Sequence, residues 1–164
     1  YLYVDVGGGS TEINLISEGE LKSSRSYNIG TVRMLSGMVK NEEKEQMHTD
    51  LEVLAKEYAP IHIIGSGGNI NKLFRLADKK DKKQLFLPLA SLQDIYRTLK
   101  DLPKEQRIKL FKLKPDRADV IVPAAEIFME VATRVQANGI IVPTIGLSDG
   151  IIDSLYTKNR QWMQ

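Results

Sequence analysis

The chain of 164 residues has no cysteine, one tryptophan and two histidines. Without cysteine it can form no disulfide bond, no thiolate metal site and no cysteine nucleophile. No run of apolar residues approaches the length of a membrane-spanning helix, and the sequence shows no secretory signal. We therefore expect a cytoplasmic protein that has no membrane partner.

The chain also lacks an excess of either charge, because its 23 lysines and arginines are nearly balanced by 21 aspartates and glutamates, and the net charge is only +2. The two signs are interspersed along the chain, which argues against a nucleic-acid partner. Two nucleotide-binding motifs are missing as well. The absence of Gly-x-x-x-x-Gly-Lys-Ser/Thr excludes a P-loop NTPase, and the absence of Gly-x-Gly-x-x-Gly after a strand disfavours a dinucleotide-binding fold.

The remaining composition, 42% hydrophobic and 27% charged residues, is typical of one globular domain. Alternating apolar residues predict strands, and apolar residues spaced by three or four predict helices. Strands are predicted over residues 2–6, 13–16, 21–29, 61–64 and 140–142. Helices are predicted over residues 31–39, 47–58, 69–76, 92–99, 108–111, 119–135 and 151–156. This order of strands and helices indicates an α/β fold.

The most apolar helix is predicted to begin at Asp119, with Pro123 close to its first turn and Gly139 in a left-handed cap after its end. Residues 41–46 are predicted to form a charged connector. The basic run at residues 78–83 is predicted to be a solvated loop, and phosphate steering is the alternative.

Neither histidine is a strong candidate for a general base. His62 alternates with Ile61 and Ile63, so we expect it to face a helix or a partner strand. His48 lies near the start of a predicted helix, where we expect it to be solvated.

The first glycine-rich turn follows the first predicted strand and contains Gly7, Gly8, Gly9 and Ser10. Three glycines remove every side chain from the turn, so a polyphosphate could lie directly against backbone N–H groups. A β-branched residue at Gly8 would fill that space and would resist a positive φ. A hairpin turn with an incidental aspartate is the simpler alternative, but three consecutive glycines favour phosphate binding.

Two acids flank the first turn. Asp5 ends the strand before it, where it could hold a hydrated divalent cation or orient a water. Glu12 brings a second carboxylate back toward the same turn. Together they predict a magnesium site.

A second glycine-rich turn, Gly65, Ser66, Gly67 and Gly68, follows the strand predicted over residues 61–64. Arg33 and Arg117 are candidates to neutralise phosphate oxygens, because the arginine fork suits bidentate contact with phosphate. Spacing alone leaves one alternative open for Arg117, namely an ion pair with a nearby acid: Asp116, Asp119 or Glu126.

The first turn and its flanks, Asp-Val-Gly-Gly-Gly-Ser-Thr-Glu at residues 5–12, resemble the second phosphate-binding motif of the exopolyphosphatase and guanosine pentaphosphate phosphohydrolase family. Four further segments resemble the same family in the same order. They are Asn-Ile-Gly-Thr-Val-Arg at 28–33, Gly-Ser-Gly-Gly-Asn-Ile at 65–70, Arg-Ala-Asp-Val-Ile-Val-Pro-Ala-Ala at 117–125 and Gly-Leu-Ser-Asp-Gly at 146–150.

This resemblance implies one lobe of an actin-like, ribonuclease H-like fold, with a mixed five-stranded sheet of βββαβα type and helices inserted before the last strand. It assigns residues 1–164 to the second, C-terminal lobe. Because Tyr1 already lies in a predicted strand, we expect a first lobe outside this chain. In the family that lobe carries the glutamate that activates water, so we expect no catalytic residue here. Glu42, Glu43, Glu45 and Glu52 would be poor substitutes.

The resemblance also implies a function. We expect a hydrolase that uses Mg²⁺ and releases terminal phosphate from inorganic polyphosphate or guanosine pentaphosphate at an interdomain cleft. The isolated chain is expected to be inactive, and the whole protein to act in the stringent response and to form a homodimer. Two alternatives stay open, an ATP-binding lobe of an actin-like kinase or ATPase and a phosphate-ligand sensor without turnover. The segment at residues 117–125 favours the phosphatases.

Overall fold

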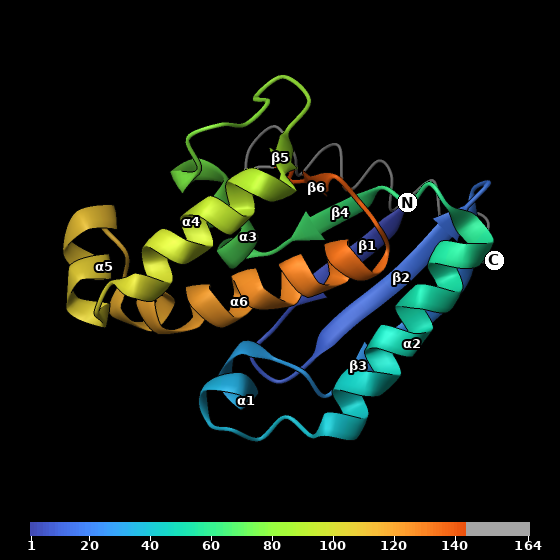
Figure 1. Cartoon of the computed structure of the whole chain (residues 1–164), viewed down its shortest axis with the longest axis horizontal. Coiled ribbons are helices and arrows are strands. Elements are labelled where there is room, and N and C mark those ends of the chain that lie inside the picture. Colours follow the sequence, from blue (N-terminus) through green and yellow to red (C-terminus); the bar gives the residue numbers. More distant parts are fainter. Residues whose placement is uncertain (144–164) are drawn as a thin grey trace.

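A computed structural model describes residues 1–143 of the chain, and it confirms the α/β class (Figure 1). The strands are β1 (Leu2–Val6), β2 (Thr11–Ser17), β3 (Glu20–Tyr27), β4 (Ile63–Ser66), β5 (Phe86–Pro88) and β6 (Gly139–Ile141). The helices are α1 (Thr31–Leu35), α2 (Asn41–Tyr58), α3 (Gly68–Leu76), α4 (Leu89–Asp101), α5 (Lys104–Phe111) and α6 (Pro115–Arg134).

The strands form one mixed sheet in the order β3-β2-β1-β4-β6-β5. Strands β1, β2 and β3 are an antiparallel meander, whereas β4 runs parallel to β1 and β6 runs parallel to β4. Because the carboxyl ends of parallel neighbours meet at one edge of a sheet, the loop after β1 and the loop after β4 lie side by side. These two loops are the two glycine-rich turns.

The core lies between one face of the sheet and the helices. Leu2 and Val4 of β1 point to this face together with Ile13 and Leu15 of β2, and all four are at most 2% exposed. Helix α6 crosses in front of the sheet with α2 and α4 on either side (Figure 1). Buried apolar residues line most of α6, which explains its central place.

The expected number of five strands is wrong, because the sheet already has six within residues 1–143. Strands β1 to β4 and β6 are the five that the sequence predicted, and β5 is the addition. It pairs antiparallel with β6 at the outer edge. Only three residues long and ending in Pro88, it is too short to show alternation and contains a residue that is rare inside strands.

Several helix ends also differ from expectation. Helix α2 begins at Asn41, so the segment predicted to be a charged connector is helical. Glu42 and Glu43 stabilise its first turn, because negative side chains interact favourably with the positive end of the helix dipole. Helix α6 begins at Pro115, which is well tolerated at the first position. Pro123 therefore lies inside the helix. The first predicted helix ends early, at Leu35, two residues before Gly37 adopts a φ of +66°.

Gly139 is not a helix cap. Gln136 adopts the left-handed conformation after α6, with a φ of 58°. Gly139 opens β6, and a β-carbon there would fall on the carbonyl group of Leu87 in β5. Close approach of two strands, not a turn, therefore requires this glycine.

Neither histidine lies where the sequence suggested. His62 is exposed, and its ring centroid lies 6.0 Å from that of Tyr1. His48 is not simply solvated, because its Nε2 lies 2.9 Å from a carboxylate oxygen of Glu130 in α6. Within residues 1–143, none of the helices combines the length and apolar character needed to span a membrane.

Candidate functional site

The first glycine turn joins β1 to β2 and is held in shape by its own backbone. The N–H of Gly7 donates to the carbonyl of Ser10 at 2.9 Å. The carbonyls of Gly7 and Gly8 accept hydrogen bonds of 3.0 Å from the first N–H groups of α1. Among the described residues, the N–H groups of Gly8, Gly9 and Ser10 have no backbone acceptor. The turn thus directs its carbonyls to α1 and leaves its amides free for an anion.

Gly30, just before α1, makes this arrangement possible. A β-carbon on Gly30 would overlap the carbonyl group of Gly8, so only glycine lets α1 approach the turn. This role of Gly30 was not predicted from the sequence. Gly30 was already part of the segment at residues 28–33, which was the available signal.

Arg33 adds positive charge beside the free amides. Its Nε donates to the carbonyl of Gly9 at 2.6 Å, which holds the guanidinium against the turn. In the described part of the chain, its two terminal nitrogens have no hydrogen-bond partner and no carboxylate partner. They can therefore contact phosphate oxygens.

The two predicted metal ligands lie opposite each other. Asp5 on β1 pairs with Glu12 on β2 in the antiparallel register, so both carboxylates project from the face of the sheet opposite the core. Partial burial, and then the negative charge of Glu12, raise the pKa of Asp5 above its usual value. Neither carboxylate has an ion-pair or hydrogen-bond partner among residues 1–143. A divalent cation would relieve this repulsion.

Magnesium suits such a pair. Over the described residues, no cluster of three or more histidine, aspartate or glutamate side chains is placed to hold a metal ion. Asp5 and Glu12 could therefore supply only two carboxylate groups. Mg²⁺ keeps several of its waters and commonly uses one or two protein carboxylates, so the pair fits that ion better than one needing a full protein shell.

The second glycine turn meets the first at Asp5. Ser66 pairs with Asp5 in the parallel register of β1 and β4. Gly67 adopts a φ of +113° and caps α3, and a β-carbon there would lie 3.6 Å from Oδ1 of Asp5. Gly65 has another role, because its missing side chain leaves room in the core for Ile140 and Phe128.

Arg117, in the first turn of α6, lies against the start of α3. Its Nη1 donates to Oδ1 of Asn69 at 2.6 Å, and a β-carbon on Gly68 would overlap its guanidinium. Position 68 therefore requires glycine, because the Arg117 guanidinium occupies the space that a side chain would need. Asn69, which holds Arg117 in place, was not identified from the sequence, since the two residues are 48 positions apart.

The alternative of an ion pair for Arg117 is not what the structure shows. Asp116 accepts the backbone N–H of Arg117, at 3.0 Å, and not its guanidinium. Asp119 binds Lys104 at 2.7 Å, and Glu126 accepts the hydroxyl of Tyr96 at 2.9 Å. All three acids have other partners, which leaves the Arg117 guanidinium available to a ligand.

The four glutamates that the sequence offered as substitutes for the general base do not lie at the turns. Glu42, Glu43, Glu45 and Glu52 all lie on α2, and Glu52 is paired with Arg134 at 2.8 Å. The glycine-rich segment at residues 146–150 and the helix predicted after it lie outside the described residues.

Comparison with known proteins places this chain in a family. The model of the Ppx/GppA phosphatase family matches residues 1–159. The chain is 28% identical over 178 aligned residues to exopolyphosphatase 2 of Mycobacterium tuberculosis, covering 94% of this chain and 55% of that protein. It therefore spans about half the length of the curated relatives it matches.

Two solved structures are similar to this one. The type II variant of the Aquifex aeolicus Ppx/GppA phosphatase is 28% identical, with a TM-score of 0.68 over 93% of this chain and 56% of that one. An exopolyphosphatase from Cytophaga hutchinsonii gives a TM-score of 0.71 at 23% identity, over 98% of this chain and 57% of that one, and shows the fold alone. From the family match along nearly the whole chain, we conclude that this chain belongs to the Ppx/GppA phosphatase family.

Proposed function

We propose that residues 1–164 are the second lobe of a phosphoanhydride hydrolase that releases terminal phosphate from inorganic polyphosphate or guanosine pentaphosphate. The observation that carries this proposal is the meeting of two glycine turns at Asp5, with free backbone amides on one and Arg117 on the other. Membership of the Ppx/GppA phosphatase family supports the reaction class.

In this proposal the chain's own residues bind and orient the phosphates. The amides of Gly8, Gly9 and Ser10 donate to phosphate oxygens, and the guanidinium groups of Arg33 and Arg117 neutralise their charge. Mg²⁺ held by Asp5 and Glu12 would supply further positive charge beside the leaving phosphate. The base that orients the attacking water would belong to the first lobe, since no acid among residues 1–143 is placed beside the two turns to act as one apart from the proposed metal ligands Asp5 and Glu12.

Substrate choice follows from the same contacts. No aromatic side chain among the described site residues could stack on a guanine base. Every candidate contact addresses phosphate oxygens, so we propose that long polyphosphate is accepted and that guanosine pentaphosphate binds mainly through its phosphates. Binding should weaken as salt rises, since these contacts are ionic. A homodimer, a cytoplasmic location and a role in the stringent response are further parts of the proposal.

The test is phosphate release by the full-length protein in the presence of Mg²⁺, with each substrate alone and in competition. We expect release from both, and excess polyphosphate should suppress hydrolysis of guanosine pentaphosphate. The isolated 164-residue chain should be slower by about a hundredfold or more, because in this proposal the base lies in the first lobe. No release by the full-length protein would overturn the proposal, and independence of the two substrates would show separate sites.

A further inference from the structure

Positive charge is concentrated in one short segment of this nearly neutral chain. Residues 72–83 contain six lysines and arginines and two aspartates, a net charge of +4, whereas the whole chain carries +2. The rest of the chain is therefore slightly acidic. The segment comprises the second half of α3 and the loop that follows it, residues 78–83, which we call the lysine loop.

The lysine loop has a defined shape. Oδ1 of Asp81 accepts hydrogen bonds of 3.0 Å from the backbone N–H groups of Lys83 and Gln84, which closes a turn. Lys80 packs over the ring of Phe74, 5.3 Å from its centroid, and donates to the Arg75 carbonyl at 2.7 Å. Asp81 and Lys80 are thus used to build the loop.

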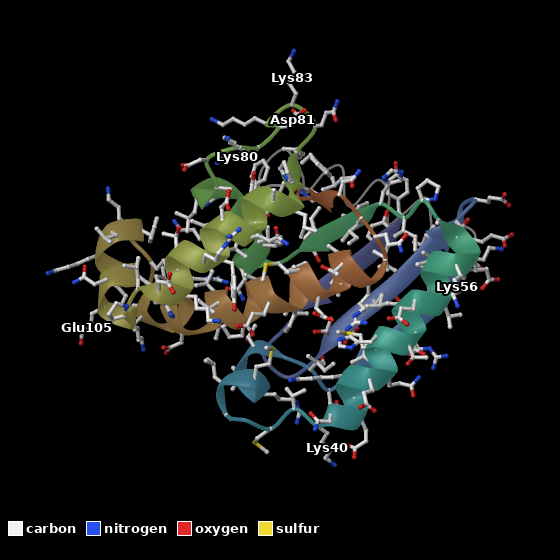
Figure 2. All side chains as sticks on the ribbon, in the orientation of Figure 1. Lys40, Lys56, Lys80, Asp81, Lys83 and Glu105 are labelled. Atoms are coloured by element: carbon white, nitrogen blue, oxygen red, sulfur yellow. The ribbon has the colours of Figure 1, made fainter. Side chains whose placement is uncertain are left out.

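The other lysines of the loop are left for a ligand. Lys79, Lys82 and Lys83 are exposed, and within residues 1–143 none of them forms a salt bridge. The loop projects from the body of the molecule, with Lys83 at its tip (Figure 2). It lines, with Arg75 and Pro88, a depression of about 860 Å³. Partial burial and then the charge of Lys82 lower the pKa of Lys80, so an anion here would relieve repulsion.

Helix α3 connects this loop to the glycine turns. The helix starts at Gly68 and has nine residues, so the two features lie about 13 Å apart along its axis. Asn69, Lys72 and Arg75 are spaced by three and share one side of the helix, away from its buried face. Asn69 holds Arg117 at the site end, and Lys72 and Arg75 continue the positive charge toward the loop.

We propose that the lysine loop and the outer side of α3 bind the distal part of a long inorganic phosphate chain whose end lies at the glycine turns. This inference rests on the proposed function for the position of the chain end. A row of separated cations suits a repeating anion, because several weak contacts on one chain add up to firm binding.

Other partners fit the surface less well. The large hydrophobic side chains that are exposed elsewhere, such as Val32 and Met38, have no counterpart between residues 72 and 88, so a protein partner would lack a buried anchor. Phe74 is buried and covered by Lys80, and the half-buried ring of Phe86 lies against Gly139, so neither ring of this segment presents an open face to the bases of a single-stranded nucleic acid.

The experiment compares two triple variants of the full-length protein, each losing three lysines. The loop variant is K79Q/K82Q/K83Q, and the control is K44Q/K56Q/K109Q, which removes exposed lysines from α2 and α5. Binding is measured with end-labelled long-chain polyphosphate, with tripolyphosphate and with a single-stranded oligonucleotide, across a range of salt. Thermal unfolding of each variant checks that it is folded.

We expect the loop variant to bind long-chain polyphosphate about tenfold more weakly, because three exposed ion pairs are lost. The slope of log affinity against log salt should fall by about 2. Tripolyphosphate, which reaches only the glycine turns, should bind both variants as it binds the wild type. Asp81→Asn keeps the acceptor that closes the turn and removes a negative charge, so it should tighten long-chain binding.

Three outcomes would overturn the inference: unchanged long-chain affinity in the loop variant, an equal loss in the control, or an oligonucleotide that binds the loop as tightly as polyphosphate. The readout is binding and not turnover, so the two proposals can fail separately. A protein that binds long polyphosphate through the loop but releases no phosphate would contradict the proposed function alone.

Discussion

The two glycine turns solve the same problem by different means. In the first, α1 holds all three glycine carbonyls: the N–H groups of Thr31 and Val32 donate to Gly7 and Gly8, and Nε of Arg33 donates to Gly9. In the second, a distant side chain completes the turn, because Arg117 of α6 lies over Gly68. The first turn therefore depends on the position of α1, whereas the second depends on how α6 packs.

The largest effect is expected from Gly30→Ala, which would disrupt the close packing of α1 against the backbone of the first turn. The new β-carbon would overlap the Gly8 carbonyl, and backbone cannot move aside as a side chain can. We expect the free energy of unfolding to fall by about 3 kcal/mol, measured by urea denaturation. Gly9→Ala is the control, since its β-carbon would lie 3.9 Å from Arg33 and should change stability little. Equal stability of the two variants would contradict the inference that α1 requires glycine at position 30.

Gly8→Val tests whether the first turn needs open space. A positive φ at Gly8 was expected from the sequence, but among the described residues positive φ values at glycine occur only at Gly19, Gly37 and Gly67. A β-carbon on Gly8 would lie 3.2 Å from Cγ2 of Val32, an exposed side chain that can shift, so the cost to the fold should be small. The new side chain would instead fill the space beside the free amides where a phosphate would bind. We expect phosphate release by the full-length protein to be abolished while its melting temperature stays near that of the wild type.

The double variant Gly8→Val, Val32→Ala sharpens this result. It removes the side chain that the new valine meets, so it restores room toward α1 but not toward a phosphate. We expect it to stay inactive. Recovery of turnover in the double variant would mean that Gly8 serves packing against α1 and not ligand binding.

Arg117→Met should remove the positive charge at the second turn and leave the first turn unchanged. We expect kcat/KM to fall about a hundredfold through loss of charge stabilisation, with little change in melting temperature. Arg107→Met is the matched control, because Arg107 binds the carbonyls of Leu99 and Ala118 at 2.6 and 3.0 Å and so supports the helices. It should lower stability more than turnover. The reverse pattern would assign Arg117 a purely structural role.

The smallest effect is expected at Asp5, where the two turns meet. The pKa of Asp5 is raised in the folded protein, which means that the fold favours the protonated carboxyl. This contribution to stability is complete below the pKa of the unfolded chain, near 3.8, and is lost as pH rises through the folded pKa and the group becomes charged. Without Mg²⁺ at pH 7, Asp5→Asn should therefore stabilise the fold, by only roughly a few tenths of a kcal/mol, because the partly buried carboxylate is still screened by water.

Glu12→Gln should also stabilise the fold in the absence of Mg²⁺ at pH 7, because it removes the other carboxylate of the repelling pair. Added Mg²⁺ should raise the melting temperature of the wild type more than that of either variant. Equal stabilisation of all three proteins by Mg²⁺ would show that the ion binds elsewhere.

Both turns could be predicted from the sequence because their signal is local. An alternating strand followed by glycines, as at Val6 and Gly7, specifies a strand end and a bare turn within a few residues. What holds each turn could not be predicted, because Gly30 meets Gly8 and Asn69 meets Arg117 only after the chain has folded. Sequence reasoning located the candidate ligand contacts and missed the residues that position them.

The fold shows the same division. The core-facing strands β1 and β4 were predicted from apolar patterns, which report burial. The start of α2 at Asn41 was missed because its first turn faces solvent and carries no apolar signal. Strand β5 was missed because its pairing with β6, and not its own composition, makes it a strand.

The outer strands of the sheet have a consequence for self-association. Of the eight residues of β3 only Tyr27 is buried, and its exposed positions carry Lys22, Arg25 and serines, while β5 at the other edge is three residues long and ends in Pro88. Charged, short or proline-containing edges resist pairing with a strand from another molecule. The protein is thereby protected against aggregation by strand addition, and replacing Ser24 and Ser26 by valine would weaken that protection.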